Sequence, residues 1–203
     1  MSQNSKISKT IEMLEEAFDI LNKEYFESAL SRSVITIQST PKAYGHFSCN
    51  KIWNDSEESQ AHEINLGAET LNREIESVIA TLIHEMVHQY CSENKIKDTS
   101  RGNTYHNQNF KIEAEKRGLI INYDKRIGWS LTTPSEELKL FIQKNEIFRR
   151  ITLHRITTPK EKKASSSTRK YVCPNSNCQQ NVRATKQVHI KCTLCELEMI
   201  VER

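Results

Sequence analysis

The sequence predicts an α+β domain followed by a second module that is too small to hold a hydrophobic core unaided. Helical and strand-like patterns of apolar residues alternate through residues 1–156. Residues 157–170 are basic, rich in serine and threonine and without apolar periodicity, which is typical of a flexible linker. Residues 171–203 then contain four cysteines in two close pairs. With 203 residues, 36% of them hydrophobic, the chain can bury one ordinary core and a small satellite.

The first domain opens with an amphipathic helix over residues 11–25. Its apolar residues recur at spacings of three and four: Ile11, Leu14, Phe18, Leu21 and Tyr25. We expect Ser8 or Thr10 to cap its N-terminus. Strand composition is found in three segments, with a polar loop over residues 54–60 before the last: residues 34–37, 44–47 and 62–66.

Three further helices are expected in the rest of the first domain. The first of them covers residues 72–90, with Asn72 as its cap. The next covers residues 106–117 and ends at Gly118. The last begins at a Pro-Ser-Glu sequence and covers residues 134–148. This order of helix, strands and helices predicts the α+β class.

The second helix contains His84-Glu85-Met86-Val87-His88, the H-E-x-x-H pattern of zinc hydrolases. Histidines four residues apart lie on one helix face and can share a metal ion, while the glutamate between them acts as a base. We therefore expect His84 and His88 to line a cleft and hold zinc, with a surface histidine pair as the alternative. The apolar residues gather on the opposite face: Ile75, Val78, Ile79, Leu82, Ile83, Met86, Val87 and Tyr90.

A catalytic zinc usually takes three protein ligands, so a third must come from elsewhere. His106 is the first candidate, because the polar loop over residues 92–105 is long enough to bring it back over the second helix. Glu113 and Glu115 are the rivals and would give a site of two histidines and one carboxylate. Two other histidines are expected to pack or to form hydrogen bonds: His46 and His62.

Such a site would hydrolyse a peptide bond without a covalent intermediate. The metal activates a water molecule and polarises the carbonyl, while Glu85 takes up the proton and passes it to the leaving amine. No spacing identifies the group that stabilises the oxyanion, for which Tyr105 and Tyr123 are candidates.

The four cysteines have the spacing of a zinc ribbon or knuckle. Four residues separate Cys173 from Cys178, two separate Cys192 from Cys195, and 13 lie between the pairs. Four thiolates close the coordination shell, so we expect this second zinc to be structural and to supply the folding energy that the module lacks. Two disulfides are the alternative, which is disfavoured because the N-terminal sequence lacks the apolar stretch of an export signal.

Charge is distributed unevenly along the chain. Residues 1–138 carry 15 Lys/Arg and 21 Asp/Glu, whereas residues 139–203 carry 14 and 5. Basic and apolar side chains are interleaved around the cysteines, a pattern suited to phosphate contacts. We expect DNA binding without sequence specificity, and a protein-binding ribbon is the competing role.

Five segments together resemble the SprT-like (Spartan-type) metalloprotease family. They are Ala43–Phe47, Trp53, His62–Leu66, Leu82–Tyr90 and His106–Phe110. The resemblance covers residues 10–130 and is closer to compact bacterial or phage members, in which a zinc ribbon following the protease domain is familiar. It implies a zincin-like fold, zinc held by His84, His88 and His106, and Glu85 as catalytic base. It also implies proteolysis of DNA-associated proteins, including DNA–protein crosslinks.

These patterns lead us to expect a zinc metalloendopeptidase with one catalytic and one structural zinc ion. Its basic ribbon and linker would hold it on DNA, and its substrates would be proteins bound there. The alternatives are a nucleic-acid-binding zinc protein with a regulatory or assembly role and little catalysis, and a zinc amidase acting on a non-protein amide. No apolar run approaches the roughly 20 residues needed to span a bilayer, so we expect no membrane partner and a cytoplasmic location, where the nucleoid is one option.

Overall fold

The computed structural model describes residues 5–54, 60–156 and 168–202. The chain divides into two compact units, residues 1–157 and 158–203. Residues 157–167 of the expected linker and residues 55–59 of the expected polar loop lie outside the described residues. Arg169 and Lys170, expected at the end of the linker, instead begin strand β10 (Arg169–Val172). None of the helices in the described ranges is long and apolar enough to cross a membrane.

The first unit combines helices and strands, which confirms the α+β prediction. Its helices are α1 (Lys6–Tyr25), the 3-10 turn η1 (Ala68–Thr70), α2 (Ile75–Glu93), α3 (Gln108–Glu115), α4 (Glu136–Lys144) and α5 (Glu146–Arg149). Its strands are β1 (Val34–Gln38), β2 (Gly45–Phe47), β3 (Trp53–Asn54), β4 (Gln60–Ala61), β5 (Glu63–Gly67), β6 (Thr99–Ser100), β7 (Tyr105–His106), β8 (Leu119–Asp124) and β9 (Gly128–Pro134).

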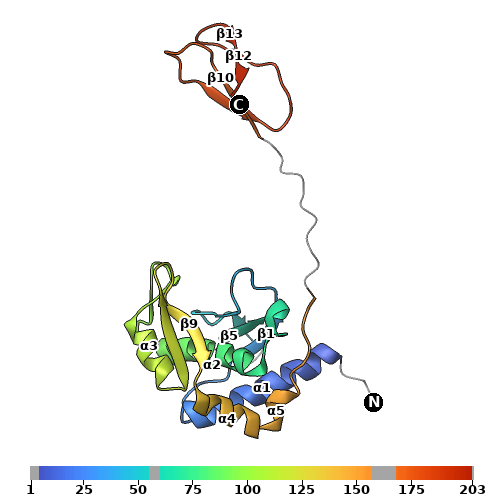
Figure 1. The fold of residues 1–203 in the computed structure, drawn as a ribbon, viewed down its shortest axis with the longest axis vertical. Coiled ribbons are helices and arrows are strands. Elements are labelled where there is room, and N and C mark those ends of the chain that lie inside the picture. Colours follow the sequence, from blue (N-terminus) through green and yellow to red (C-terminus); the bar gives the residue numbers. More distant parts are fainter. Residues whose placement is uncertain (1–4, 55–59, 157–167, 203) are drawn as a thin grey trace. The chain divides into compact units, whose positions relative to one another are not determined.

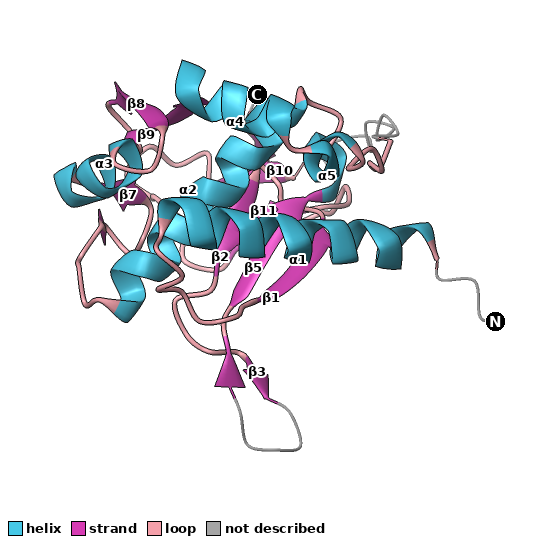
Figure 2. Ribbon diagram, turned by 90° about the horizontal axis from the view of Figure 1, so that it is seen from below, coloured by secondary structure: helices cyan, strands magenta, loops and turns pink. Residues whose placement is uncertain are grey.

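Three strands form the first sheet, in the order β1-β5-β2. The central strand β5 is parallel to β1 and antiparallel to β2. Helices α1 and α2 pack against this sheet, and Figure 2 shows α1 lying along it. Ile64 and Leu66 of β5 point into the core, because alternate residues of a strand share a face. In the order β1-β5-β2, strand β2 forms one edge of the sheet within the described residues, and it lies against α2.

A second sheet contains four strands in the order β6-β7-β9-β8. The sequence predicts no strand between residue 66 and the cysteine module, and in this respect the prediction is wrong. Strands β6 and β7 have only two residues each, which is too short for a periodic signal. This sheet and α3 pack on α2, which lies in Figure 1 between α3 and the first sheet. Helix α2 thus joins both sheets and carries the H-E-x-x-H sequence at their junction.

The first two helices are not capped by the residues that the sequence predicted. The Ser5 side chain accepts a hydrogen bond from the amide of Ser8 at 3.2 Å and so caps α1, whereas Thr10 donates to a carbonyl inside the helix. The prediction of Ser8 or Thr10 as the cap is therefore wrong. Helix α2 begins after Glu74 without a side-chain cap, so Asn72 does not cap it either.

The later helices also differ from the predicted spans. His106 lies in β7, and α3 begins only after Asn107. The side chain of Asn107 accepts hydrogen bonds from the amides of Asn109 and Phe110. The predicted helix over residues 134–148 is divided at Asn145, whose backbone is extended (φ −104°, ψ 110°) and separates α4 from α5.

The second unit consists of short strands around the four cysteines. Strand β10 pairs antiparallel with β11 (Asn181–Ala184) and β14 (Ile200–Val201), and β12 (Lys191–Cys192) pairs with β13 (Leu197–Glu198). Its buried cluster is small: Tyr171, Cys173, Cys192 and Met199. So few buried side chains cannot stabilise a separate fold, which makes a metal the natural source of its stability.

Candidate metal centres

Three imidazole rings converge in the first unit. His84 and His88 come from one face of α2, and His106 comes from β7. The Nε2 atom of His106 lies 3.2 Å from that of His84 and 3.0 Å from that of His88. Tetrahedral zinc with bonds of 2.0–2.1 Å separates its nitrogen ligands by about 3.3 Å. The three nitrogens therefore need only a small expansion to hold such an ion.

A glycine allows β7 to bring His106 to this position. The backbone amide of His106 donates to the carbonyl of Ile127 at 2.9 Å, and His106 is paired with Gly128 of β9. Gly128 has a φ of +75°, and a Cβ there would lie only 2.1 Å from the carbonyl oxygen of His106. The close approach of β7 and β9, and with it the position of the third histidine, therefore requires glycine.

Each histidine is held by a hydrogen bond to its other ring nitrogen. The Nδ1 atom of His84 lies 2.8 Å from Thr132 Oγ1, and that of His88 lies 2.5 Å from Asp98 Oδ2. The Nδ1 atom of His106 faces a backbone carbonyl at 3.3 Å. Partners of this kind keep the proton on Nδ1, so the Nε2 lone pairs are left to face the centre.

Two of the three clustered histidines, His84 and His106, have lowered pKa values. Burial lowers the pKa of His84 well below its ordinary value, and the neighbouring histidines lower it further. Burial also lowers the pKa of His106 to about 4, with His88 adding to the effect. Neutral imidazole is the form that binds metal, so the donor set fits zinc.

Glu85 is buried between α2 and β2. Its side chain is only 5% exposed, and burial raises its pKa to about 7 even though the Phe47 amide donates a hydrogen bond to it. Gly45 of the same strand also lies close to the carboxylate, because a Cβ there would lie 3.1 Å from Glu85 Oε1 and 2.8 Å from the Asn65 carbonyl oxygen. The missing side chain at Gly45 thus makes room for the carboxylate. The expected apolar face opposite the histidines is only part of the packing of α2, because Glu85 is buried as well.

The rival ligands are engaged elsewhere. Glu113 forms ion pairs with Arg117 at 2.7 Å and Lys116 at 2.8 Å, and Glu115 faces Lys111 at 3.8 Å. The structure therefore brings His106, and neither of these carboxylates, to the two histidines of α2.

The remaining candidate residues make other contacts. The Nε2 atom of His46 faces Glu63 at 3.4 Å, and the Nδ1 atom of His62 lies 2.8 Å from a backbone carbonyl. The hydroxyls of Tyr105 and Tyr123 bond to each other at 3.0 Å, and no described contact joins either to the histidine cluster.

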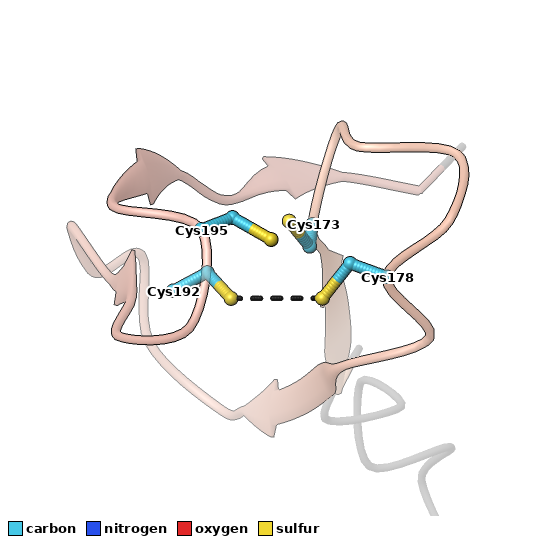
Figure 3. Close-up of side chains that lie close together, drawn as sticks. All are labelled: Cys173, Cys178, Cys192 and Cys195. Atoms are coloured by element: carbon cyan, nitrogen blue, oxygen red, sulfur yellow. Dashed lines mark hydrogen bonds between the residues drawn. The ribbon is translucent and has the colours of Figure 1, made fainter.

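The four cysteines of the second unit form the other candidate centre. Figure 3 shows their sulfur atoms turned toward one another, and all four lie within 4.8 Å of each other. The sulfurs of Cys178 and Cys192 are 3.8 Å apart, and all four cysteines are free thiols, so the structure contains neither of the alternative disulfides. A hydrogen bond from the Cys195 amide, aided by that of Leu194, lowers the pKa of Cys192 to about 7. Burial and the neighbouring thiols raise the pKa of Cys173 to about 12, so one thiol of the metal-free cluster is the first to ionise.

Sequence patterns did not reveal the residues that orient the histidines. Asp98 lies ten residues beyond His88 in an irregular segment, and Thr132 lies in a strand that the sequence did not predict. Neither has a diagnostic spacing, because its role depends on tertiary contact alone. The β-branched and aromatic residues Ile120, Ile121 and Tyr123 of β8 were a local signal that could have revealed the second sheet.

Comparisons with known proteins point to one family. Neither the curated proteins nor the solved structures give a significant match to this chain. The model of the SprT-like family matches residues 14–123, which is more than half of the chain. The match includes Glu85 and all three clustered histidines, while the cysteine module lies beyond it. The chain therefore belongs to the SprT-like family.

Proposed function

We propose that this chain is a zinc-dependent endopeptidase with a zincin-like fold that cleaves proteins associated with DNA. The observation that carries the proposal is the convergence of three histidine Nε2 atoms, with a buried glutamate on the same helix. Zinc metallopeptidase activity is associated with the SprT-like family, which supports the same assignment.

The residues of the site have separate tasks in this proposal. His84, His88 and His106 would hold the catalytic zinc through Nε2. Zinc in such a site acidifies water and polarises a substrate carbonyl. Glu85 takes the proton from the attacking water and delivers it to the leaving amine. Burial, which raises the pKa of Glu85 in the metal-free protein, favours proton uptake by this carboxylate.

The edge strand β2 is suited to binding an extended peptide. The backbones of Tyr44 and Ser48, the residues just before and after β2, form hydrogen bonds with β5. Backbone groups alternate in direction along a strand, so the amide of Phe47 points away from β5 and donates to Glu85. No strand pairs with that second edge of β2 in the part of the chain that the structure describes. A peptide that adds to an exposed edge is held by main-chain hydrogen bonds, whatever its sequence. A peptide bond would then lie beside Glu85.

The cysteine cluster would hold a second, structural zinc ion. Four thiolates leave no coordination position for water or substrate. Binding of a structural zinc contributes about 10–16 kcal/mol in small zinc modules, which compensates for the small buried cluster of the second unit.

DNA association is proposed from charge. Residues 139–203 carry 14 Lys/Arg and 5 Asp/Glu, and the strands of the second unit expose Arg183 and Lys191. Electrostatic contact with phosphates needs no base sequence, so tethering would direct the peptidase to any protein held on DNA, crosslinked proteins included. Such substrates would place the protein in the compartment that holds the DNA, which in a bacterial cell is the cytoplasm with its nucleoid.

Cleavage of a DNA-binding test protein, with and without single-stranded DNA, tests the proposal. Glu85→Gln keeps the size of the side chain and removes the base. Glu76→Gln makes the same change in the first turn of α2 and serves as the control. At equal zinc content we expect DNA-stimulated cleavage by the wild type and by Glu76→Gln, and none by Glu85→Gln. Equal cleavage by Glu85→Gln, or none by any protein with both metal sites filled, would overturn the peptidase assignment.

A further inference from the structure

A continuous row of aromatic and cationic side chains involves the second sheet and α3. The Arg101 guanidinium lies over the ring of Tyr105 at 4.4 Å, and the hydroxyls of Tyr105 and Tyr123 are 3.0 Å apart. The Tyr123 and Trp129 rings meet edge to face at 5.1 Å, and the Lys111 ammonium lies 4.1 Å from the Trp129 ring centre. We call these five residues the aromatic row.

The row shares strands β7 and β9 with the proposed catalytic centre. Tyr105 directly precedes His106 in β7, and Trp129 follows Gly128, the residue that lets β7 approach β9. The row therefore follows the second sheet at the point where that sheet supplies the third histidine.

The middle of the row is open to solvent. Tyr123 is 48% exposed, although it lies in a strand that packs against α3. The register of β8 and β9 shifts between Asn122 and Tyr123, where β9 carries one extra residue, Ser130, between the partners of these two residues. The exposed ring of Tyr123 is available for stacking.

The segment that carries the row is basic, unlike the rest of the first unit. Residues 95–129 hold eight Lys/Arg and four Asp/Glu, whereas residues 1–94 hold seven and fifteen. Arg101, at one end of the row, is exposed and has no carboxylate within ion-pair distance among the described residues. Lys111, at the other end, contacts Glu115 only at 3.8 Å. The positive charge at both ends favours a polyanion over a neutral peptide.

We propose that the aromatic row binds single-stranded DNA on the peptidase unit itself, with a base stacked on Tyr123 and phosphates near Arg101 and Lys111. Single strands expose the faces of their bases, and stacking on aromatic side chains together with backbone contacts to cations is the general mode of binding them. Duplex DNA hides those faces and gains only the electrostatic part. The inference rests on the proposed function. It adds a second DNA contact, made by residues of the peptidase unit and not by those of the ribbon.

The test measures binding of a fluorescently labelled oligothymidylate to the full chain by anisotropy. All proteins carry Glu85→Gln so that self-cleavage cannot interfere. Tyr123→Ala removes the stacking ring, and Tyr123→Phe keeps the ring while removing the hydroxyl. Tyr44→Ala is the matched control, because Tyr44 is also an exposed tyrosine with a guanidinium, that of Arg73, 4.0 Å from its ring centre.

We expect Tyr123→Ala to weaken oligothymidylate binding about 5- to 150-fold, the range for loss of one stacked base. Tyr123→Phe and Tyr44→Ala should bind within about twofold of the parent. Arg101→Gln, at an exposed position, should weaken binding and lower the slope of log affinity against log salt by about 0.7. Binding to a duplex of the same length should respond to Arg101→Gln but not to Tyr123→Ala.

Unchanged affinity in both Tyr123→Ala and Arg101→Gln would overturn the inference, even if the ribbon still binds DNA. A full chain that binds no oligothymidylate would overturn it as well, together with the proposed DNA association. If the two changes, made in the active protein without Glu85→Gln, raise KM for a protein substrate while DNA affinity in the Glu85→Gln proteins is unaltered, the row binds protein and the inference is wrong. Because binding is measured without catalysis, failure of the peptidase assignment would leave this result intact.

Discussion

The hydrogen bond between Asp98 and His88 allows the proposed zinc site to be weakened without removing a ligand. Asp98 Oδ2 lies 2.5 Å from His88 Nδ1, and both side chains are only 14% exposed, so solvent screens the contact little. Loss of an orienting partner of this kind typically lowers metal affinity by 10- to 100-fold, or about 1.4–2.7 kcal/mol. Asp98→Asn keeps an oxygen acceptor and removes the charge, so we expect an effect near tenfold. Asp98→Ala removes the acceptor and should approach 100-fold.

A competition titration with a chromophoric chelator measures this effect on the full chain. The cysteine site serves as an internal reference, because its affinity should stay unchanged in both variants. Glu115→Gln provides the matched control, since this carboxylate faces Lys111 on α3 and contacts none of the clustered histidines in the described part of the chain. Asp98→Ala with the zinc affinity of the wild type at both sites would refute the view that Asp98 orients a metal ligand.

Three other predictions follow from the packing of the two centres. Gly45→Ala should displace the Glu85 carboxylate, because the new Cβ would lie 3.1 Å from Oε1. The cleavage rate should then fall about 100-fold at unchanged zinc content. Full activity of this variant would contradict the importance of the contact. In the metal-free protein the raised pKa of Glu85 stabilises the fold below its ordinary value of 4.5, and this stabilisation is lost as the pH rises through about 7. Between pH 4.5 and 8 the free energy of unfolding of the wild type, measured with denaturant, should therefore fall by about 3 kcal/mol more than that of Glu85→Gln. Parallel pH profiles of the two proteins would refute the burial argument. Cys192→Ser should reduce bound zinc from two ions to one and unfold residues 168–202, seen as collapsed amide dispersion for that unit alone; loss of the first unit's signals as well would contradict its independence.

The sequence was most informative where a motif is local. His84 and His88 are four residues apart on one helix, so the 3.6-residue period alone brings their rings together. Cys192 and Cys195 are likewise neighbours along the chain, and their spacing predicted the cluster that the second unit contains.

The sequence was least informative where position depends on contacts between distant segments. His106 was predicted at a helix start, and its actual strand has only two residues, held by Gly128 more than 20 residues later. Asp98 and Thr132 become visible only once that second sheet is formed around the histidines. Short strands of this kind have no periodicity of their own, so pairing partners far along the chain determine them.

The helix boundaries failed for a different reason. Ser5, Ser8 and Thr10 are all acceptable caps by residue type, and only the backbone conformation before the helix selects Ser5. The residues on both sides of Asn145 form helices, but the extended backbone of Asn145 itself divides the last predicted helix in two.

Restoring zinc to the metal-free chain tests the central claim most directly. Zinc per chain and cleavage rate are measured on the same samples, for the wild type and for His106→Ala. The account predicts that the wild type binds two zinc ions and that cleavage rises with filling of the histidine site, while His106→Ala retains the cysteine-bound ion and cleaves nothing. Cleavage that does not depend on zinc content, or that survives in His106→Ala, would contradict it.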